Sequence, residues 1–227
     1  MGSKISVNLF RAKKIMANTD PNIKDPSQMP KSVWFATKKA YSTLLKQDME
    51  IRRFLNVKLK PAGIVEVTIK RYIKRVEITI FATKPGIIIG KAGASINALK
   101  EELLKKFQLP QDTRLEVSEI KNPYTSSKAV ADEIAYMLQK GTAVRRVCKF
   151  TMEKVKQSGI PGCKIIISGR INGAEIARQE KFGFGSIPRH TIDANIDHAL
   201  VHCKTVAGIL GISVMMYKGD KITNFNS

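Results

Sequence analysis

Acidic residues and long apolar runs are scarce in this 227-residue chain. It has 19 Asp and Glu against 39 Lys and Arg, which gives a formal net charge of +20. Such an excess of one sign repels itself in a compact chain unless a polyanion neutralises it, so we expect nucleic acid as the partner. No stretch of the sequence approaches the roughly 20 consecutive apolar residues of a membrane-spanning helix, and we expect no membrane partner.

Cysteine is also scarce, and its spacing suggests neither a disulfide framework nor a zinc site. Cys148, Cys163 and Cys203 form no CxxC pair, the spacing at which cysteines commonly bind zinc. We expect them to be small buried side chains in a reducing compartment. His198 and His202 lie close to Cys203 but lack the glutamate of an HExxH motif and any further ligand nearby in sequence. We therefore predict no metal site, no cofactor and no catalytic residue.

A glycine-rich turn stands in the middle of the stretch KPGIIIGKAGASINALKEELLKKF. The turn consists of Gly90, Lys91, Ala92 and Gly93, and apolar residues recur at helical spacing after it. A glycine turn that leads into a helix N-terminus leaves backbone N–H groups free and has no Cβ to keep a phosphate oxygen away. We therefore predict that this turn binds an anion.

Three glycine-loop motifs compete for this turn, and two of them do not fit. A P-loop requires G-x-x-x-x-G-K-[ST], but Gly86 lies only four residues before Gly90, and Ala92 replaces the hydroxyl that holds Mg²⁺. The dinucleotide-binding fingerprint G-x-G-x-x-G does not fit either, because Gly90 and Gly93 supply only its second half. The KH motif, a GxxG between two helices with a strand on each side, fits the segments 76–81 and 113–120. A plain helix-turn-helix that uses glycine for its shape is the alternative.

The N-terminal quarter carries nearly half of the net charge. Residues 1–60 contain 13 Lys and Arg against 4 acids. Residues 1–31 are rich in turn formers and poor in apolar side chains, which predicts a basic arm that orders on RNA. From 32 to about 55 the apolar residues recur at helical spacing, so we expect a helix whose apolar residues pack in a core. The alternating segments 64–73 and 76–82 then predict an antiparallel hairpin.

A domain boundary is predicted at Lys121-Asn122-Pro123, and two helices follow it. The second, from 142 to about 158, has two distinct faces when its residues are placed at 100° intervals. One face is apolar and is expected to pack: Val144, Val147, Cys148, Thr151 and Val155. The opposite face is expected to point outward: Arg145, Arg146, Lys149, Glu153 and Lys156.

The last third of the chain predicts four short strands, at 163–168, 174–182, 191–198 and 209–217. Two helices followed by four strands predict a domain with the helices against one sheet face. The predicted fold class is therefore α+β. Its parts are a basic arm (1–31), a helix plus KH domain (32–121), a second α+β domain (122–220) and a short tail (221–227).

The stretch SGRINGAEIARQE at 168–180, followed by GSIP and by a late GxxG at 208–211, resembles the C-terminal domain of small-subunit ribosomal protein number three, bacterial or organellar in type. The KH segment and VRRVCK at 144–149 are similar to the same family, so the resemblance covers about residues 34–219. It implies a type II KH domain followed by the α+β domain. It also implies a structural place in the small-subunit head, bound to ribosomal RNA beside small-subunit proteins ten and fourteen. The ribosome would be cytoplasmic or that of an organellar matrix.

The resemblance further implies a role at the channel through which messenger RNA enters. The family's messenger-facing basic residues match Arg145, Arg146 and Lys149. Fixed cations on a rigid helix attract phosphate whatever the base. They can therefore hold one strand of a folded messenger while translocation pulls it, which assists unwinding without ATP. A free-standing KH regulator of single-stranded RNA is the alternative function.

Four more basic residues are predicted to contact ribosomal RNA: Lys4, Arg11, Arg170 and Arg178. The first two match the family's N-terminal pattern, although Val7 and Leu9 stand where the family has proline and glycine. The last two flank a strand corner. For Arg178 an ion pair with Glu175 or Glu180 is the alternative, since surface pairs of this sort are frequent.

Overall fold

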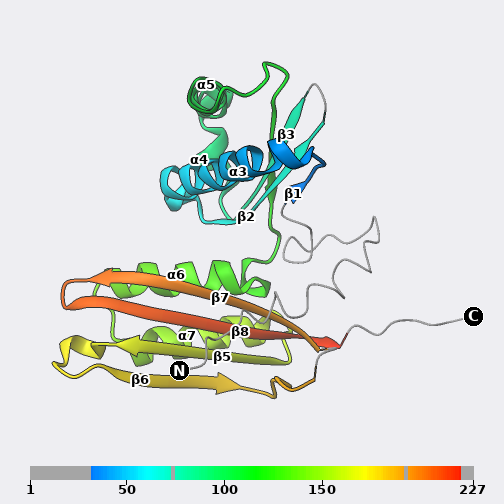
Figure 1. Ribbon diagram of the computed structural model, residues 1–227. Coiled ribbons are helices and arrows are strands. Elements are labelled where there is room, and N and C mark those ends of the chain that lie inside the picture. The colour runs from blue at the N-terminus through cyan, green and yellow to red at the C-terminus, as the bar shows by residue number, and fades with distance from the viewer. Residues whose placement is uncertain (1–31, 73–74, 192–193, 221–227) are drawn as a thin grey trace, which may run out of the picture. The chain divides into compact units, whose positions relative to one another are not determined.

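The computed structural model describes residues 32–72, 75–191 and 194–220 (Figure 1). The chain divides into two compact units between Lys121 and Asn122, each with its own four-stranded sheet. Helices and strands occur in both units, and the predicted α+β class is confirmed. The predicted arm and tail, with Lys4 and Arg11, lie outside the described residues.

The first unit is built on a sheet with the strand order β1-β2-β3-β4. Its strands are β1 (Ser32–Val33), β2 (Ile64–Arg71), β3 (Val76–Ala82) and β4 (Arg114–Glu119). β2 and β3 are antiparallel as predicted, whereas β1 runs parallel to β2 and β4 runs parallel to β3. Alternate side chains of β3, Ile78 and Ile80 among them, are buried because one face of the sheet covers the core.

Three helices complete this unit. They are α3 (Lys38–Lys58), α4 (Pro85–Ile89) and α5 (Ala94–Phe107), with the short 3₁₀ segments η2 (Lys60–Ala62) and η3 (Lys91–Gly93). Their buried residues join the core above the sheet: Ile51, Leu55, Ile88, Leu99 and Leu103. Between β3 and β4 stand α4, η3 and α5, so the β-α-α-β order predicted around the glycine turn is confirmed.

The first helix begins later than its apolar pattern predicted. Ser32 and Val33 pair with Ile69 and Lys70 of β2, which places them in a strand and leaves α3 to begin at Lys38. The expectation that the apolar residues of this region pack in a core is wrong for several residues that precede the buried Ile51. Five of them are exposed: Val33, Phe35, Tyr41, Leu45 and Met49.

A buried carboxylate holds this region together instead. Asp48 of α3 is 1% exposed, and its Oδ2 accepts a hydrogen bond from Trp34 Nε1 at 2.8 Å. Its Oδ1 accepts a hydrogen bond from Arg71 Nε of β2, also at 2.8 Å. A buried charge is tolerated when it is paired and hydrogen-bonded. Asp48 therefore fixes α3 against β2 and against the segment that leads out of β1.

The second unit has two helices on one face of an antiparallel sheet, whose strand order is β6-β5-β8-β7 (Figure 1). Its helical segments are η4 (Pro123–Thr125), α6 (Ser127–Gln139), α7 (Val144–Gln157) and η5 (Ile171–Gly173). Its strands are β5 (Gly162–Gly169), β6 (Arg178–Phe184), β7 (Ala194–Thr205) and β8 (Gly208–Asp220). The layer arrangement predicted for this part of the chain is confirmed.

Its strands differ from their predicted bounds, β6 and β7 most of all. The strand expected from residue 174 begins only at Arg178, because Arg170 to Ala174 form a tight turn with Asn172 in the left-handed region at φ 55°. The strand expected at 191–198 continues to Thr205, because it pairs with β8 along its whole length up to a hairpin turn between Thr205 and Gly208.

The helix α6 begins at a carboxylate that the sequence did not reveal. The backbone N–H of Ser127 donates a hydrogen bond to Asp197 Oδ2 of β7 at 3.0 Å. No side-chain cap is supplied by Ser126, the residue at the N-cap position. A carboxylate at this end satisfies a free N–H and meets the positive end of the helix dipole. Lys218 Nζ lies 3.7 Å from the same oxygen and compensates its charge.

Candidate nucleic-acid interface

The glycine turn of the first unit has a backbone that only glycine adopts easily. Gly90 has φ 70° and ψ −175°, and Gly93 lies in the left-handed region at φ 77°. A Cβ on Gly90 would overlap Ser95 Oγ and lie 2.7 Å from Ser95 Cβ. The two glycines therefore allow the backbone angles of the turn, and their lack of a side chain lets a ligand approach the backbone closely.

The first turn of α5, directly after Gly93, has neither an acidic residue nor a side-chain cap. Its backbone N–H groups are thus left to water or to an anion. Lys91 is exposed within the loop and adds a positive charge. On α4, Ile87 and Ile89 are exposed on either side of the buried Ile88. Uncapped backbone N–H groups, an exposed lysine and two exposed isoleucines thus lie along one short segment.

The second basic feature is α7, whose two predicted faces are confirmed. Its five buried residues are the ones predicted: Val144, Val147, Cys148, Thr151 and Val155. The side chains of Arg145, Arg146 and Lys149 are all exposed. Arg145 Nε lies 3.7 Å from Glu180 Oε2 of β6, whereas Arg146 and Lys149 have no ion-pair partner among the residues described here. The helix therefore offers a row of fixed cations on a packed base.

A fourth cation of α7 has a structural role that the sequence analysis missed. Lys154 Nζ donates a hydrogen bond to the hydroxyl of Tyr124 at 2.7 Å and lies 3.3 Å from Glu133 Oε1 of α6. The hydrogen bond to Tyr124 is the main cause that raises the pKa of Lys154, and Glu133 adds to it. Lys154 thus holds α7 against η4 and α6, which keeps the exposed cations in a fixed position.

The two arginines predicted at the strand corner are both engaged within the chain. Arg170 donates hydrogen bonds from Nε to the carbonyl of Ala174 at 2.9 Å and from Nη1 to the carbonyl of Ala207 at 3.0 Å. It therefore joins the turn after β5 to the turn between β7 and β8. Arg178 Nη2 lies 3.4 Å from Glu180 Oε1, which is one of the two ion pairs weighed for it.

The histidines and the nearby cysteine do not converge on a metal site. His198 Nε2 lies 3.0 Å from Ser213 Oγ, and burial lowers the pKa of this imidazole. Cys203 is buried and donates from Sγ to the carbonyl of Ala135. In the described parts of the chain, no three His, Cys, Asp or Glu side chains are grouped as metal ligands. The same residues include no helix long and apolar enough to cross a bilayer.

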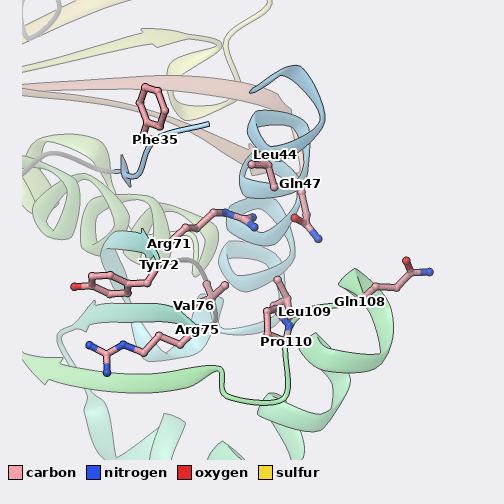
Figure 2. A pocket seen from close by; sticks show the side chains of 10 residues that line it. All are labelled: Phe35, Leu44, Gln47, Arg71, Tyr72, Arg75, Val76, Gln108, Leu109 and Pro110. Atoms are coloured by element: carbon pink, nitrogen blue, oxygen red, sulfur yellow. The ribbon is translucent and has the colours of Figure 1, made fainter. Parts of the chain in front are cut away.

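The first unit also contains a pocket that sequence reasoning did not anticipate (Figure 2). Its volume is about 910 Å³, and its lining includes Phe35, Leu44, Val76 and Leu109. The two arginines that line it are both compensated. Arg71 is bound to Asp48, and Arg75 Nε lies 3.2 Å from Glu77 with its guanidinium over the ring of Tyr72.

Comparisons with known proteins agree with this architecture. Residues 50–125 match the KH domain family, and residues 134–216 match the family described as "Ribosomal protein S3, C-terminal domain". The fold and these matches define an RNA-binding ribosomal protein.

Full-length relatives make the assignment specific. "Small ribosomal subunit protein uS3c" of Guillardia theta, an organellar form, is 37% identical over 86% of this chain and 90% of its own. "Small ribosomal subunit protein uS3" of Laribacter hongkongensis is 41% identical over 83% and 80%, and that of Persephonella marina is 41% identical over 85% and 84%. This chain belongs to the small ribosomal subunit protein uS3 family.

The family membership decides between the two functions left open by the sequence. The chain is a structural constituent of the small ribosomal subunit, where it is located and binds RNA, and not a free-standing KH regulator. It contains two separate basic features, the glycine turn in the first unit and the exposed face of α7 in the second.

Proposed function

We propose that this chain binds ribosomal RNA in the head of the small subunit and lines the channel through which messenger RNA enters, and that it does so without enzymatic activity. The observation that carries the proposal is the exposed face of α7, where Arg145, Arg146 and Lys149 stand on a helix whose opposite face is fully packed. Cations held in this way bind phosphate without selecting a base, as passage of any message requires.

The same geometry supports a passive role in unwinding. A messenger strand held by fixed cations resists being drawn back into a hairpin while translocation moves the other strand away. The free energy comes from translocation, so α7 has only to hold its place. Lys154, through Tyr124 and Glu133, supplies that rigidity.

The glycine turn is proposed to bind the backbone of ribosomal RNA. Gly90 and Gly93 let the RNA backbone approach the N–H groups at the start of α5, and Lys91 adds charge. Replacing Lys91 and Ala92 with aspartate would place two carboxylates there. We expect weaker RNA association with an unchanged fold, whereas unchanged assembly into subunits would mean that the segment is only a turn.

Further contacts are proposed for Lys4, Arg11, Arg170 and Arg178, with small-subunit proteins ten and fourteen as neighbours. Arg170 uses Nε and one Nη1 proton within the chain, and a guanidinium has five N–H donors, so three stay available for phosphate. Arg178 is exposed beside Glu180. Its guanidinium can contact RNA phosphate while it stays in the ion pair with Glu180.

Translation through a hairpin tests the α7 proposal. The triple variant Arg145→Ala, Arg146→Ala, Lys149→Ala should slow ribosomes at a hairpin downstream of the start codon but not on an unstructured message. A matched variant with Arg145→Lys and Arg146→Lys retains the charge and should behave as the parent chain. Equal rates of the triple variant and the parent on both messages would contradict the proposal.

A further inference from the structure

The sheet of the second unit has one face that none of the helices described in that unit covers. Both α6 and α7 lie on the other side, as Figure 1 shows. Side chains alternate along each strand, so the residues between the buried ones of β5, β7 and β8 point to this uncovered face. Two of these residues, Leu200 of β7 and Ile209 of β8, are 57% and 66% exposed.

Strand pairing places the side chains of this face in rows. One row crosses the sheet from Lys181 through Ile166 and Ser213 to Leu200. The adjacent row contains Lys164, Met215 and His198, and a third includes Ser168, Gly211 and His202. Strands lie about 4.8 Å apart, so each row is about 14 Å long. We call these three rows, with Lys204 and Ile209 beside them, the open sheet face.

Charge is segregated between the two sides of this sheet. The carboxylates of β5, β6 and β7 are Glu180 and Asp197, and both point to the helices. Glu180 pairs with Arg145 of α7, and Asp197 binds Ser127 of α6. The open sheet face therefore has lysines without an opposing acid. Lys164, Lys181 and Lys204 have no ion-pair partner among the described residues.

The other side chains of this face favour protein over RNA as the occupant. Sheets that bind RNA stack bases on aromatic rings and use arginine beside them. On this side of the sheet Tyr217 is the one Phe, Tyr or Trp of the strands, beside His198 and His202, and there is no arginine, because Arg178 shares the helix side with Glu180, Phe182 and Phe184. The apolar side chains between the lysines are aliphatic or thioether: Leu200 and Ile209 are exposed, and Ile166 and Met215 are half-buried.

We propose that the open sheet face docks an acidic, amphipathic segment of a neighbouring protein in the ribosomal particle. The apolar side of that segment covers Ile166, Leu200 and Met215, and its carboxylates pair with Lys164 and Lys181. Burial of the apolar side chains supplies the attraction, and the lysines select an acidic partner over a basic one. This interaction lies beyond the RNA contacts proposed for α7 and for the glycine turn.

Photochemical cross-linking in assembled small subunits tests this docking. The full chain with Leu200→p-benzoylphenylalanine, and separately with Ile209→p-benzoylphenylalanine, is irradiated in purified subunits, and the cross-linked peptide is sequenced by mass spectrometry. The expected product is a protein peptide with acidic residues within a turn of the cross-link. A product with ribosomal RNA alone, or with no polymer at either position, overturns the proposal.

Charge variants of the chain that carries p-benzoylphenylalanine test the role of the lysines. Lys164→Glu with Lys181→Glu should lower the cross-link yield at least tenfold, whereas Lys164→Arg with Lys181→Arg should retain it. An unchanged yield in the glutamate variant overturns the proposed selection. The hairpin assay on the same particles reports the α7 function separately, so failure of the docking leaves that result unaffected.

Discussion

The guanidinium of Arg145 on α7 lies 3.7 Å from the carboxylate of Glu180 on β6. Arg178 approaches the same carboxylate at 3.4 Å. Glu180 is only 16% exposed, whereas Arg145 is 77% exposed, so the acid lies beneath a cation that faces solvent. One end of the basic face of α7 is therefore partly neutralised from within the chain, and the charge of Arg146 and Lys149 is not.

Removal of this carboxylate should strengthen RNA binding. In Glu180→Gln no carboxylate competes with RNA for Arg145 and Arg178. We expect the affinity for single-stranded RNA to rise about 2- to 5-fold, which corresponds to the interaction free energy of an exposed ion pair. Glu175→Gln changes the net charge equally, but Glu175 has no ion pair among the described residues. Filter binding at fixed salt measures both variants, and equal gains would show that net charge alone is responsible.

The glycine turn should respond to substitution at one glycine and not at its neighbour. Gly90→Ala forces a Cβ into Ser95 at φ 70°, and we expect it to lower the free energy of unfolding by about 1–3 kcal/mol. Gly86 lies in α4 with no atom near its would-be Cβ, and Gly86→Ala should be neutral or stabilising by up to about 1 kcal/mol. Urea unfolding gives both values, and a similar loss in the two variants would contradict this account of the turn.

The carboxylate at the start of α6 should matter more than a half-buried carboxylate further along the same helix. Asp197→Ala removes the acceptor for the Ser127 N–H and the partner of Lys218, and we expect a loss of about 1–3 kcal/mol. The control is Asp132→Ala, whose carboxylate pairs with Lys128 on the surface of α6 and should cost about 0.5 kcal/mol or less. Thermal and urea unfolding of the full chain compare them. If Asp197→Ala lost less unfolding free energy than Asp132→Ala, Asp197 would not be the cap of α6.

Alkaline pH should destabilise the second unit through its buried thiols. Burial raises the pKa of Cys148 and of Cys163 to about 12, with Glu180 adding to the effect at Cys148. Well below pH 8 both thiols keep their protons in the folded and the unfolded chain, so stability does not change through them. As the pH rises through about 9, only the unfolded chain loses these protons. The free energy of unfolding then falls with a slope that approaches about 1.4 kcal/mol per pH unit for each thiol by about pH 10.

Urea unfolding at pH 8, 9 and 10 measures this slope. The control is the double variant Cys148→Ala, Cys163→Ala, which is less stable at every pH but should show a shallower decline above pH 9. Parallel curves for the variant and the parent chain would mean that these thiols do not cause the pH dependence.

Local patterns predicted the parts of the molecule that depend on neighbouring residues in sequence. The two faces of α7 needed only the angle between successive side chains, and the KH order needed only the glycine turn and its flanks. The start of α3 could not be predicted, because Ser32 pairs with Ile69, 37 residues later in the chain. The apolar pattern before Lys38 is typical of a helix, yet strand pairing decides its structure.

The partners of the charged site residues depend on contacts that are distant in sequence. Glu180 is 35 residues from Arg145, and Asp197 is 70 residues from Ser127. The sequence identified Glu180 as a partner for Arg178 but gave no signal that it also reaches α7. The pocket near Phe35 and the open sheet face likewise arise from residues that only the fold brings together.

Sedimentation of lysates from the cells that make this chain tests most directly whether it is a resident RNA-bound protein of the small subunit. On a sucrose gradient at low salt, the chain should migrate with small-subunit ribosomal RNA, and nuclease treatment should release it. A chain found mainly at the top of the gradient, free of ribosomal RNA, would contradict the account.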